Sequence, residues 1–161
     1  VLRGARPEDA AAIRRLHEAA FGRAAEADLV EALAGDWEIS IVLEAGGEIA
    51  GHVLLSRAHV GQTPLLALAP LGVHPDHRDG GHGRTLVRAA IATARQTAFP
   101  AIVVIGNPAY YAKLGFEPAR RLGLKCPFRV RRETWRAYRL PAWRDDLRGT
   151  VRYPDAFRAL A

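Results

Sequence analysis

An apolar run passes into a glycine-rich loop and then into a helical pattern in residues 71–85, LGVHPDHRDGGHGRT. Residues 65–73 are almost wholly apolar, which is typical of a central strand covered on both faces. A strand, a short loop and a helix in this order aim free backbone N–H groups and the positive helix end at one point. Glycine lets a ligand approach the backbone closely. The sequence therefore predicts a phosphate-binding loop at 77–83, while a tight turn without a ligand remains the alternative.

Two common phosphate motifs do not fit this loop. A P-loop needs Gly-Lys-Ser/Thr at the helix start, and Gly83-Arg84-Thr85 lacks the lysine. A dinucleotide fold needs Gly-x-Gly-x-x-Gly and an acidic residue about 20 positions later, and the glycines here stand at 80, 81 and 83. The phosphate of a different kind of ligand is therefore expected.

Helical and strand patterns continue on both sides of the loop, which predicts an α/β (α+β) domain over residues 1–161. Gly46-Gly47 reads as a hairpin turn, and Asn107-Pro108 as a helix start. We expect a short edge strand at 1–5, helices at 7–21 and 26–33, strands at 39–44, 48–60 and 65–73, a helix at 84–98, a strand at 101–105, a helix at 107–114 and a last strand at 134–140. Residues 141–161 form a C-terminal extension whose structure the pattern leaves open.

Composition excludes several classes of protein. Cys126 is the only cysteine, so an intramolecular disulfide and a Cys-rich metal site are both excluded. No apolar run reaches the ~18 to 20 residues that cross a bilayer, and residues 1–15 do not resemble a signal peptide. We therefore expect a cytoplasmic protein with no membrane partner and no metal.

The formal net charge of +6 allows two interpretations. Lys113 and Lys125 are the only lysines, and so strong a bias toward arginine reflects genome composition more than function. Aromatic residues do interleave with arginines over 129–158, as stacking on nucleic-acid bases would require. Strand packing with solvated charge explains the same pattern, so nucleic-acid binding is the less favoured interpretation.

Two motifs resemble the GNAT superfamily of N-acetyltransferases. Arg78-x-x-Gly81-x-Gly83 matches the coenzyme A pyrophosphate loop, Gln/Arg-x-x-Gly-x-Gly/Ala. Further along the chain, Tyr110-Tyr111-Ala112-Lys113-Leu114-Gly115-Phe116 resembles the signature Tyr-x-Lys-x-Gly-Phe on the helix after the fifth strand. Both motifs stand in the family's order, and the resemblance extends from Pro7 to Leu140.

The resemblance implies a mixed, mostly antiparallel sheet that splays between its fourth and fifth strands and is flanked by about four helices. It also implies acetyl-coenzyme A as the cosubstrate, bound in the gap between 65–73 and 101–105. Backbone groups near 71–73 would bond the pantetheine arm and the acetyl carbonyl, and the amides of 79–84 the pyrophosphate. The implied cofactor-binding residues are Leu71, Gly72, Val73, Arg78, Asp79, Gly80, Gly81, His82, Gly83, Arg84, Thr85, Asn107 and Tyr110. Arg78, Arg84 and Arg88 either contact phosphate or are solvated surface.

Tyr111 matches the family position that donates a proton to the departing thiolate, and Tyr110 takes this role if the register shifts by one. A phenol has a pKa of ~10 and a thiol ~8.5, so full proton transfer is uphill by roughly 2 kcal/mol. Tyr111 then needs a lowered pKa, or it only donates a hydrogen bond to the sulfur. A core aromatic residue without a catalytic role is the alternative.

The residue that deprotonates the attacking amine is left open. His52 and His74 are candidates because histidine titrates near neutral pH, although each is more often structural, and family members often use water. Cys126 has no activating partner in the sequence and is expected to be structural. Val104 stands where many members have asparagine, and 122–132 either lines an acceptor pocket or packs on the surface.

These observations lead to one main hypothesis and two alternatives. The main hypothesis is an enzyme that moves acetyl from acetyl-coenzyme A to a primary amine by direct attack in a ternary complex. The acceptor, a small molecule or a peptide, is not identified, and a homodimer is compatible with the family. The alternatives are a non-catalytic acyl-coenzyme A-binding module and an Arg-rich nucleic-acid-binding protein.

Overall fold

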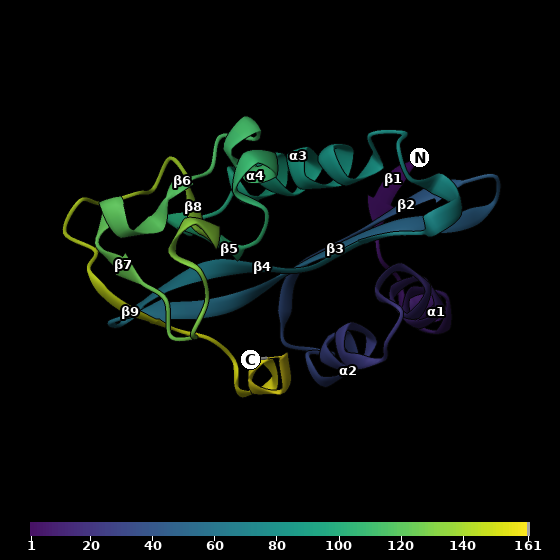
Figure 1. The fold of residues 1–161 in the computed structure, drawn as a ribbon, viewed down its shortest axis with the longest axis horizontal. Helices are drawn as coiled ribbons and strands as arrows, with labels where there is room; N and C mark the ends of the chain where they lie inside the picture. Colours follow the sequence, from purple (N-terminus) through teal and green to yellow (C-terminus); the bar gives the residue numbers. More distant parts are fainter. Residues whose placement is uncertain (161) are drawn as a thin grey trace.

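The computed structural model describes residues 1–160, whose nine strands form a twisted sheet with helices on both faces (Figure 1). The strands follow the order β1-β2-β3-β4-β5-β8-β6, with β9 paired to β3 and β7. Their bounds are β1 Leu2–Gly4, β2 Trp37–Ala45, β3 Glu48–Val60, β4 Thr63–Val73, β5 Ala101–Ile105, β6 Glu117–Pro118, β7 Leu124–Lys125, β8 Trp135–Arg139 and β9 Gly149–Arg152. The α-helices are α1 Ala10–Phe21, α2 Ala25–Ala32, α3 His82–Ala94 and α4 Pro108–Lys113; short 3-10 helices include η2 Pro75–His77 and η5 Asp155–Leu160.

The first four strands form an antiparallel meander, which includes the hairpin predicted at Gly46-Gly47. Gly46 and Gly47 have φ of 61° and 78°, the left-handed values that a two-residue turn between β2 and β3 needs. The strands β2, β3 and β4 together carry many of the buried aliphatic side chains. These continuously paired strands form the part of the sheet from which the loop after β4 extends.

The sheet opens between β4 and β5, the only parallel neighbours in the main strand order. They pair at Leu66↔Ile102 and Ala67↔Val103, whereas β4 runs on to Val73 without a partner on that side. A bulge lies at the same place: Leu55 faces Leu68 and Val53 faces Leu71, so two residues of β4 oppose one of β3. Bulges bend a strand and increase its twist. The predicted splayed sheet is therefore confirmed.

Helices cover the two faces of the sheet in different ways (Figure 1). On one face α3 buries Leu86, Val87 and Ala90 against the aliphatic side chains of β2, β3 and β4, and α4 lies beside it. On the other face lie α1, α2 and η5, where Leu29 of α2 and Phe157 of η5 share a small cluster with β3.

Two boundaries differ from the prediction. Helix α3 ends at Ala94 rather than at 98, because the Thr97 hydroxyl donates to the Ala94 carbonyl at 2.6 Å and the amides of Gln96 and Thr97 form tight i→i+3 bonds. The predicted strand 134–140 is present as β8, but it is not the last one, because β9 follows it in the extension that sequence left open. Its four residues bury only Val151, so its sequence carries almost no strand pattern. No helix among residues 1–160 is long and apolar enough to cross a membrane.

Candidate active site

The loop after β4 contains a series of backbone N–H groups that donate to no acceptor among residues 1–160. The amides of His77 and Arg78 donate back to the carbonyls of His74 and Pro75. From Asp79 to Arg84, no amide bonds to an acceptor within residues 1–160, and the next bonded amide is Thr85, to the Gly81 carbonyl at 3.1 Å. Asp79 and Gly81 have φ of 70° and 75°. These left-handed residues turn successive amides toward the start of α3, where an anion is stabilised.

A cavity of about 500 Å³, here called the loop cavity, lies against these amides. Its walls come from β4, the loop, the start of α3 and α4. It is lined by Leu71, Val73, His77, Arg78, Asp79, Gly81, His82, Gly83, Arg84 and Tyr110. Two arginines and free amides against one carboxylate make its lining favourable to a polyanion. The loop cavity has the chemistry that a diphosphate requires.

The arginines of the loop have different environments. Arg78 donates from Nη2 to the Ala20 carbonyl at 2.7 Å, which ties the loop to the C-terminal end of α1. Arg84 lies over the backbone of Gly81, since a Cβ built there would be 3.2 Å from its Nη2. Thr85 donates both its amide and its hydroxyl to the Gly81 carbonyl. Arg84 is thus placed to meet an anion, whereas Arg78 and Thr85 also shape the loop.

The adjacent tyrosines Tyr110 and Tyr111 lie in different surroundings. Asn107 caps α4 by accepting from the Tyr110 amide at 2.9 Å, as its position before Pro108 predicts. The Tyr110 hydroxyl lies against Gly83, where a Cβ would approach it to 2.7 Å, so Tyr110 forms a wall of the loop cavity. Only glycine at 83 leaves that space free.

Tyr111 points into the core at the end of β5. Its ring packs against Gly106 and Phe116, and its side chain is 7% exposed. Burial raises the pKa of Tyr111 above its ordinary value, so the phenol keeps its proton. Its hydroxyl bonds to no residue of 1–160, and it is not among the fully buried polar atoms that lack a partner. Tyr111 is therefore a free donor among residues 1–160, and its ring lies next to Gly106, directly after β5.

A buried histidine pair supports β4 from the opposite face. Ser40 Oγ lies 2.9 Å from His52 Nε2, and His52 Nδ1 lies 2.9 Å from His17 Nε2. Burial lowers the pKa of His17 to about 4 and of His52 to about 3. Gly72 pairs with His52 across the strands, and a Cβ on Gly72 would meet His17 Nδ1 at 2.6 Å. Gly72 thus lets this pair approach β4.

This arrangement bears on the two histidines that sequence offered as bases. His52 is fully buried and both of its nitrogens are engaged, so it has no route to an amine in a cavity. His74 Nδ1 accepts from the Asp76 amide at 3.1 Å, which starts the short helix η2. His17 was absent from the sequence prediction. Its only signal in the sequence was Gly72, because a glycine within a strand can mark a place where another group packs closely against the backbone.

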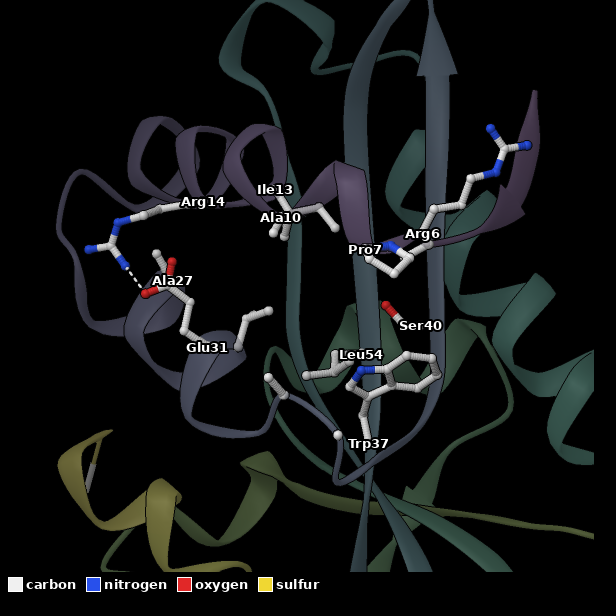
Figure 2. A pocket seen from close by; sticks show the side chains of 14 residues that line it. Arg6, Pro7, Ala10, Ile13, Arg14, Ala27, Glu31, Trp37, Ser40 and Leu54 are labelled. Atoms are coloured by element: carbon white, nitrogen blue, oxygen red, sulfur yellow. Dashed lines mark hydrogen bonds and ion pairs between the residues drawn. The ribbon is translucent and has the colours of Figure 1, made fainter.

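A second cavity, of about 350 Å³, lies between α1, α2 and the sheet (Figure 2). Figure 2 shows the Ser40 side chain directed toward it, Trp37 on one wall, and the ion pair of Arg14 with Glu31 at its edge. No residue of β4 or β5 lines this cavity. It is therefore separate from the open end of the sheet.

A third cavity, of about 630 Å³, lies at the opening itself and is here called the gap cavity. Residues of β4, the end of β5, the 127–130 loop and η5 enclose it. It is lined by Arg23, Leu68, Ala69, Ile105, Pro127, Phe128, Arg129, Val130, Tyr153, Phe157 and Leu160. Sequence offered 122–132 as one wall of such a pocket, and 127–130 are there. It gave no signal for Phe157 or Leu160, which come from the extension.

The aromatic residues of the C-terminal region are packed inside the protein. Trp135 is 2% exposed and donates from Nε1 to the Leu124 carbonyl at 2.9 Å. The Tyr153 ring contacts Phe128 and Phe157 at centroid distances of 5.2 and 4.9 Å. Packing within the protein therefore accounts for these rings without base stacking. Strand packing with solvated charge accounts for the pattern that had allowed a nucleic-acid interpretation.

Most of the residues predicted to bind the cofactor come together at one place. Nine of them line the loop cavity: Leu71, Val73, Arg78, Asp79, Gly81, His82, Gly83, Arg84 and Tyr110. Gly72, Gly80, Thr85 and Asn107 support this wall from behind or beside it. Within residues 1–160, no three His, Cys, Asp or Glu side chains are grouped to hold a metal ion.

Comparisons with known proteins agree with this geometry. The model of the acetyltransferase (GNAT) family matches residues 10–116. The uncharacterized N-acetyltransferase YjhQ of Escherichia coli K12 is 34% identical over 91% of this chain and 88% of its own length. The crystal structure of the GNAT family N-acetyltransferase YhbS from Escherichia coli in complex with CoA has a TM-score of 0.89 and 30% identity, and covers 98% of this chain and 91% of that one. A GNAT family acetyltransferase from Brucella melitensis in complex with acetyl-CoA has a TM-score of 0.82 and 28% identity, over 98% and 97% of the two chains. This chain is therefore a member of the GNAT family of N-acetyltransferases.

Proposed function

We propose that this enzyme binds acetyl-coenzyme A in the opening between β4 and β5 and transfers the acetyl group directly to a primary amine in a ternary complex. The observation that carries the proposal is the run of unbonded amides from Asp79 to Arg84 beside that opening. The two relatives of known structure hold CoA and acetyl-CoA, which supports the same donor here.

The loop cavity would hold the diphosphate, and the unpaired edge of β4 the pantetheine arm. Amides 79–84 donate hydrogen bonds to an anion, and Arg84 adds charge. Beyond Ala67, β4 has backbone groups on the side of β5 that β5 does not pair, and an extended amide-containing chain can bond to them as a strand does. The bound acetyl thioester supplies the electrophilic carbon. The protein positions the cosubstrate and supplies hydrogen-bond donors to it.

The gap cavity would receive the acceptor, since it reaches the same opening through Ala69 and Ile105. Of the residues that the structure describes, no aspartate, glutamate or histidine lines it. Apolar surroundings and the Arg129 guanidinium disfavour a bound ammonium and so lower its pKa. The amine thus binds as a neutral nucleophile or gives its proton to water, and no protein base is needed.

Tyr111 would donate a hydrogen bond to the sulfur that leaves. Its raised pKa makes complete proton transfer to a thiolate unfavourable, because the phenol is the weaker acid. A hydrogen bond to developing negative charge still lowers the barrier. Of the two possibilities that sequence left open, we propose that Tyr111 stabilises the thiolate without full proton transfer.

Two measurements test the proposal. Isothermal titration calorimetry should show acetyl-coenzyme A binding to the purified chain, and mass spectrometry of an amine library should show one or more acetylated products that need the protein. A folded chain that gives no heat with acetyl-coenzyme A would contradict the donor site. A chain that binds it but acetylates no amine would be the non-catalytic binding module instead.

Three further features are part of the proposal. We propose that residues 1–161 act as one acetyltransferase domain, that the protein works in the cytoplasm, and that a homodimer is compatible with its activity. Size-exclusion chromatography with light scattering measures the last of these. A single monomeric species with full activity would remove the homodimer.

A further inference from the structure

The gap cavity carries information about the acceptor that the family does not supply. We propose that the acceptor is a free amino acid with a large apolar side chain, held by its carboxylate on Arg129. This inference rests on the proposed function, because it takes the amine of that amino acid to be the group that is acetylated.

The charge of the lining indicates the kind of acceptor that the gap cavity can hold. Among residues 1–160, Arg23 and Arg129 are the only ionisable side chains of the lining apart from the tyrosine phenol, and no acidic side chain of these residues lines the cavity. A site for a polyamine or another polycation needs carboxylates, and leaving its ammonium groups unpaired in an apolar cavity is costly. The lining instead complements a ligand with negative charge.

The two arginines are not equivalent. Arg23 is engaged by Glu26 through two contacts, Nε to Oε1 at 3.0 Å and Nη2 to Oε2 at 2.5 Å. Glu26 is buried, so this pair is held in place and its charge is compensated. The Arg129 side chain is exposed and takes part in none of the hydrogen bonds or ion pairs among residues 1–160. Its guanidinium can donate two parallel hydrogen bonds to the oxygens of one carboxylate.

The remaining wall of the gap cavity is apolar and largely aromatic. Phe128, Tyr153 and Phe157 meet edge to face, and Val130 and Leu160 continue this apolar surface. Such a wall favours an aromatic or large aliphatic side chain, because each ring buries a large apolar area in a preferred geometry. A small or polar amino acid would leave the wall without a partner.

The amine of such an amino acid would face the opening between β4 and β5. In an amino acid the amine and the carboxylate share one carbon, so a carboxylate on Arg129 and a side chain on Phe128 leave the amine as the remaining polar group. Ala69 of β4 and Ile105 of β5 form the side of the cavity at the strand opening. This is the direction from which the acetyl group would be reached. The arrangement fixes three points of the ligand.

The test compares Arg129→Gln with Arg131→Gln, a matched control in the same loop. Arg131 is 80% exposed and does not line the gap cavity. Calorimetry with CoA present would measure binding of N-acetyl-L-phenylalanine and of its amide, N-acetyl-L-phenylalaninamide. We expect the acid to bind about tenfold more tightly than the amide, as a charge-assisted bond predicts. Arg129→Gln should abolish this preference, and Arg131→Gln should keep it.

Turnover provides an independent readout. With saturating acetyl-coenzyme A, L-phenylalanine should be acetylated in preference to L-phenylalaninamide, L-glutamate and spermidine. Arg129→Gln should raise the KM for L-phenylalanine about tenfold and change kcat little. The KM for phenylalaninamide should stay the same.

The outcomes separate this inference from the proposed function. If acetyl-coenzyme A does not bind, the proposed function fails. If it binds and spermidine or L-phenylalaninamide is acetylated in preference to L-phenylalanine, the proposed function stands and the inference is overturned. Binding of acetyl-coenzyme A with no acetylation of any amino acid overturns it as well, as does an acid preference that survives in Arg129→Gln.

Discussion

The loop cavity and the gap cavity meet the same opening between β4 and β5, yet they are built from different parts of the chain. The loop cavity uses backbone amides and glycines from the contiguous stretch 71–84, with Tyr110 as its one distant wall. The gap cavity uses side chains from five separate segments, the last of them near the C-terminus. Backbone geometry ties a site to a local motif, whereas side chains can form one wherever the fold brings them together.

The largest effect is expected from filling the loop cavity. In Gly83→Trp an indole would occupy the space in front of the amides, where even a Cβ meets the Tyr110 hydroxyl at 2.7 Å. Losing two or more charge-assisted bonds of ~1.5 to 3 kcal/mol each should weaken acetyl-coenzyme A binding by about 100-fold or more. Calorimetry measures it.

Ala92→Trp is the control for this change. It places the same side chain on the exposed face of the same helix and should leave the affinity unchanged. Equal affinities in Gly83→Trp and Ala92→Trp would mean that the ligand does not approach these amides.

Of the two adjacent tyrosines, Tyr111 is expected to affect turnover and Tyr110 the affinity for acetyl-coenzyme A. Tyr111→Phe removes a donor that no protein group uses, so stability should change little while kcat falls about tenfold or more. Tyr110→Phe alters the wall beside Gly83 and should raise the Kd for acetyl-coenzyme A a few fold at nearly constant kcat. Steady-state kinetics and calorimetry on both variants check this. A full kcat in Tyr111→Phe, or a reversed pattern, would reassign the role.

Independence of the two cavities is tested from the other side. Val130 lines the gap cavity on an exposed loop, and Val130→Trp should fill part of it. We expect turnover to fall about tenfold through a higher acceptor KM, with acetyl-coenzyme A affinity within twofold of the parent. If Val130→Trp weakens the donor as strongly as the acceptor, the two cavities are not separate sites.

The smallest effect concerns the histidine pair behind β4. Because the pKa values of His17 and His52 fall to about 4 and about 3 in the folded chain, the unfolded chain binds more protons below pH ~6.5. Their contribution to stability is complete above pH ~6.5 and is lost as the pH falls toward 4. Urea unfolding between pH 7.5 and 5 should therefore show a decreasing free energy of unfolding.

His52→Gln should reduce this dependence by about half, because one of the two titrating groups is removed. The amide of glutamine can still bond to Ser40. A free energy of unfolding that is flat from pH 7.5 to 5 in the parent would show that the pair is not held neutral.

Sequence predicted most of the donor side for a physical reason. A phosphate loop needs glycines and a helix start at fixed spacing. Gly81 and Gly83 have this spacing directly after a strand, so they indicate the loop from sequence alone. The cap at Asn107 and the turn at Gly46 are local in the same sense. Such features depend on neighbours within a few positions, which a sequence displays directly.

The rest depended on contacts between distant segments. β9 pairs with β3 across about 90 residues, and η5 brings Phe157 to a cavity that Leu68 also lines. His17 and His52 meet only because α1 packs on β3 and β4. The early end of α3 came from a hydroxyl of Thr97, a local competition that helical periodicity does not show.

The central claim is that the amides from Asp79 to Arg84 bind the diphosphate of coenzyme A. Amide chemical shifts of the ¹⁵N-labelled protein, followed during titration with coenzyme A and with pantetheine, measure it most directly. We predict large shifts at 79–84 with coenzyme A and small ones with pantetheine, which lacks the diphosphate. Unchanged shifts at these amides, in a protein that other signals show to be saturated with coenzyme A, would contradict the account.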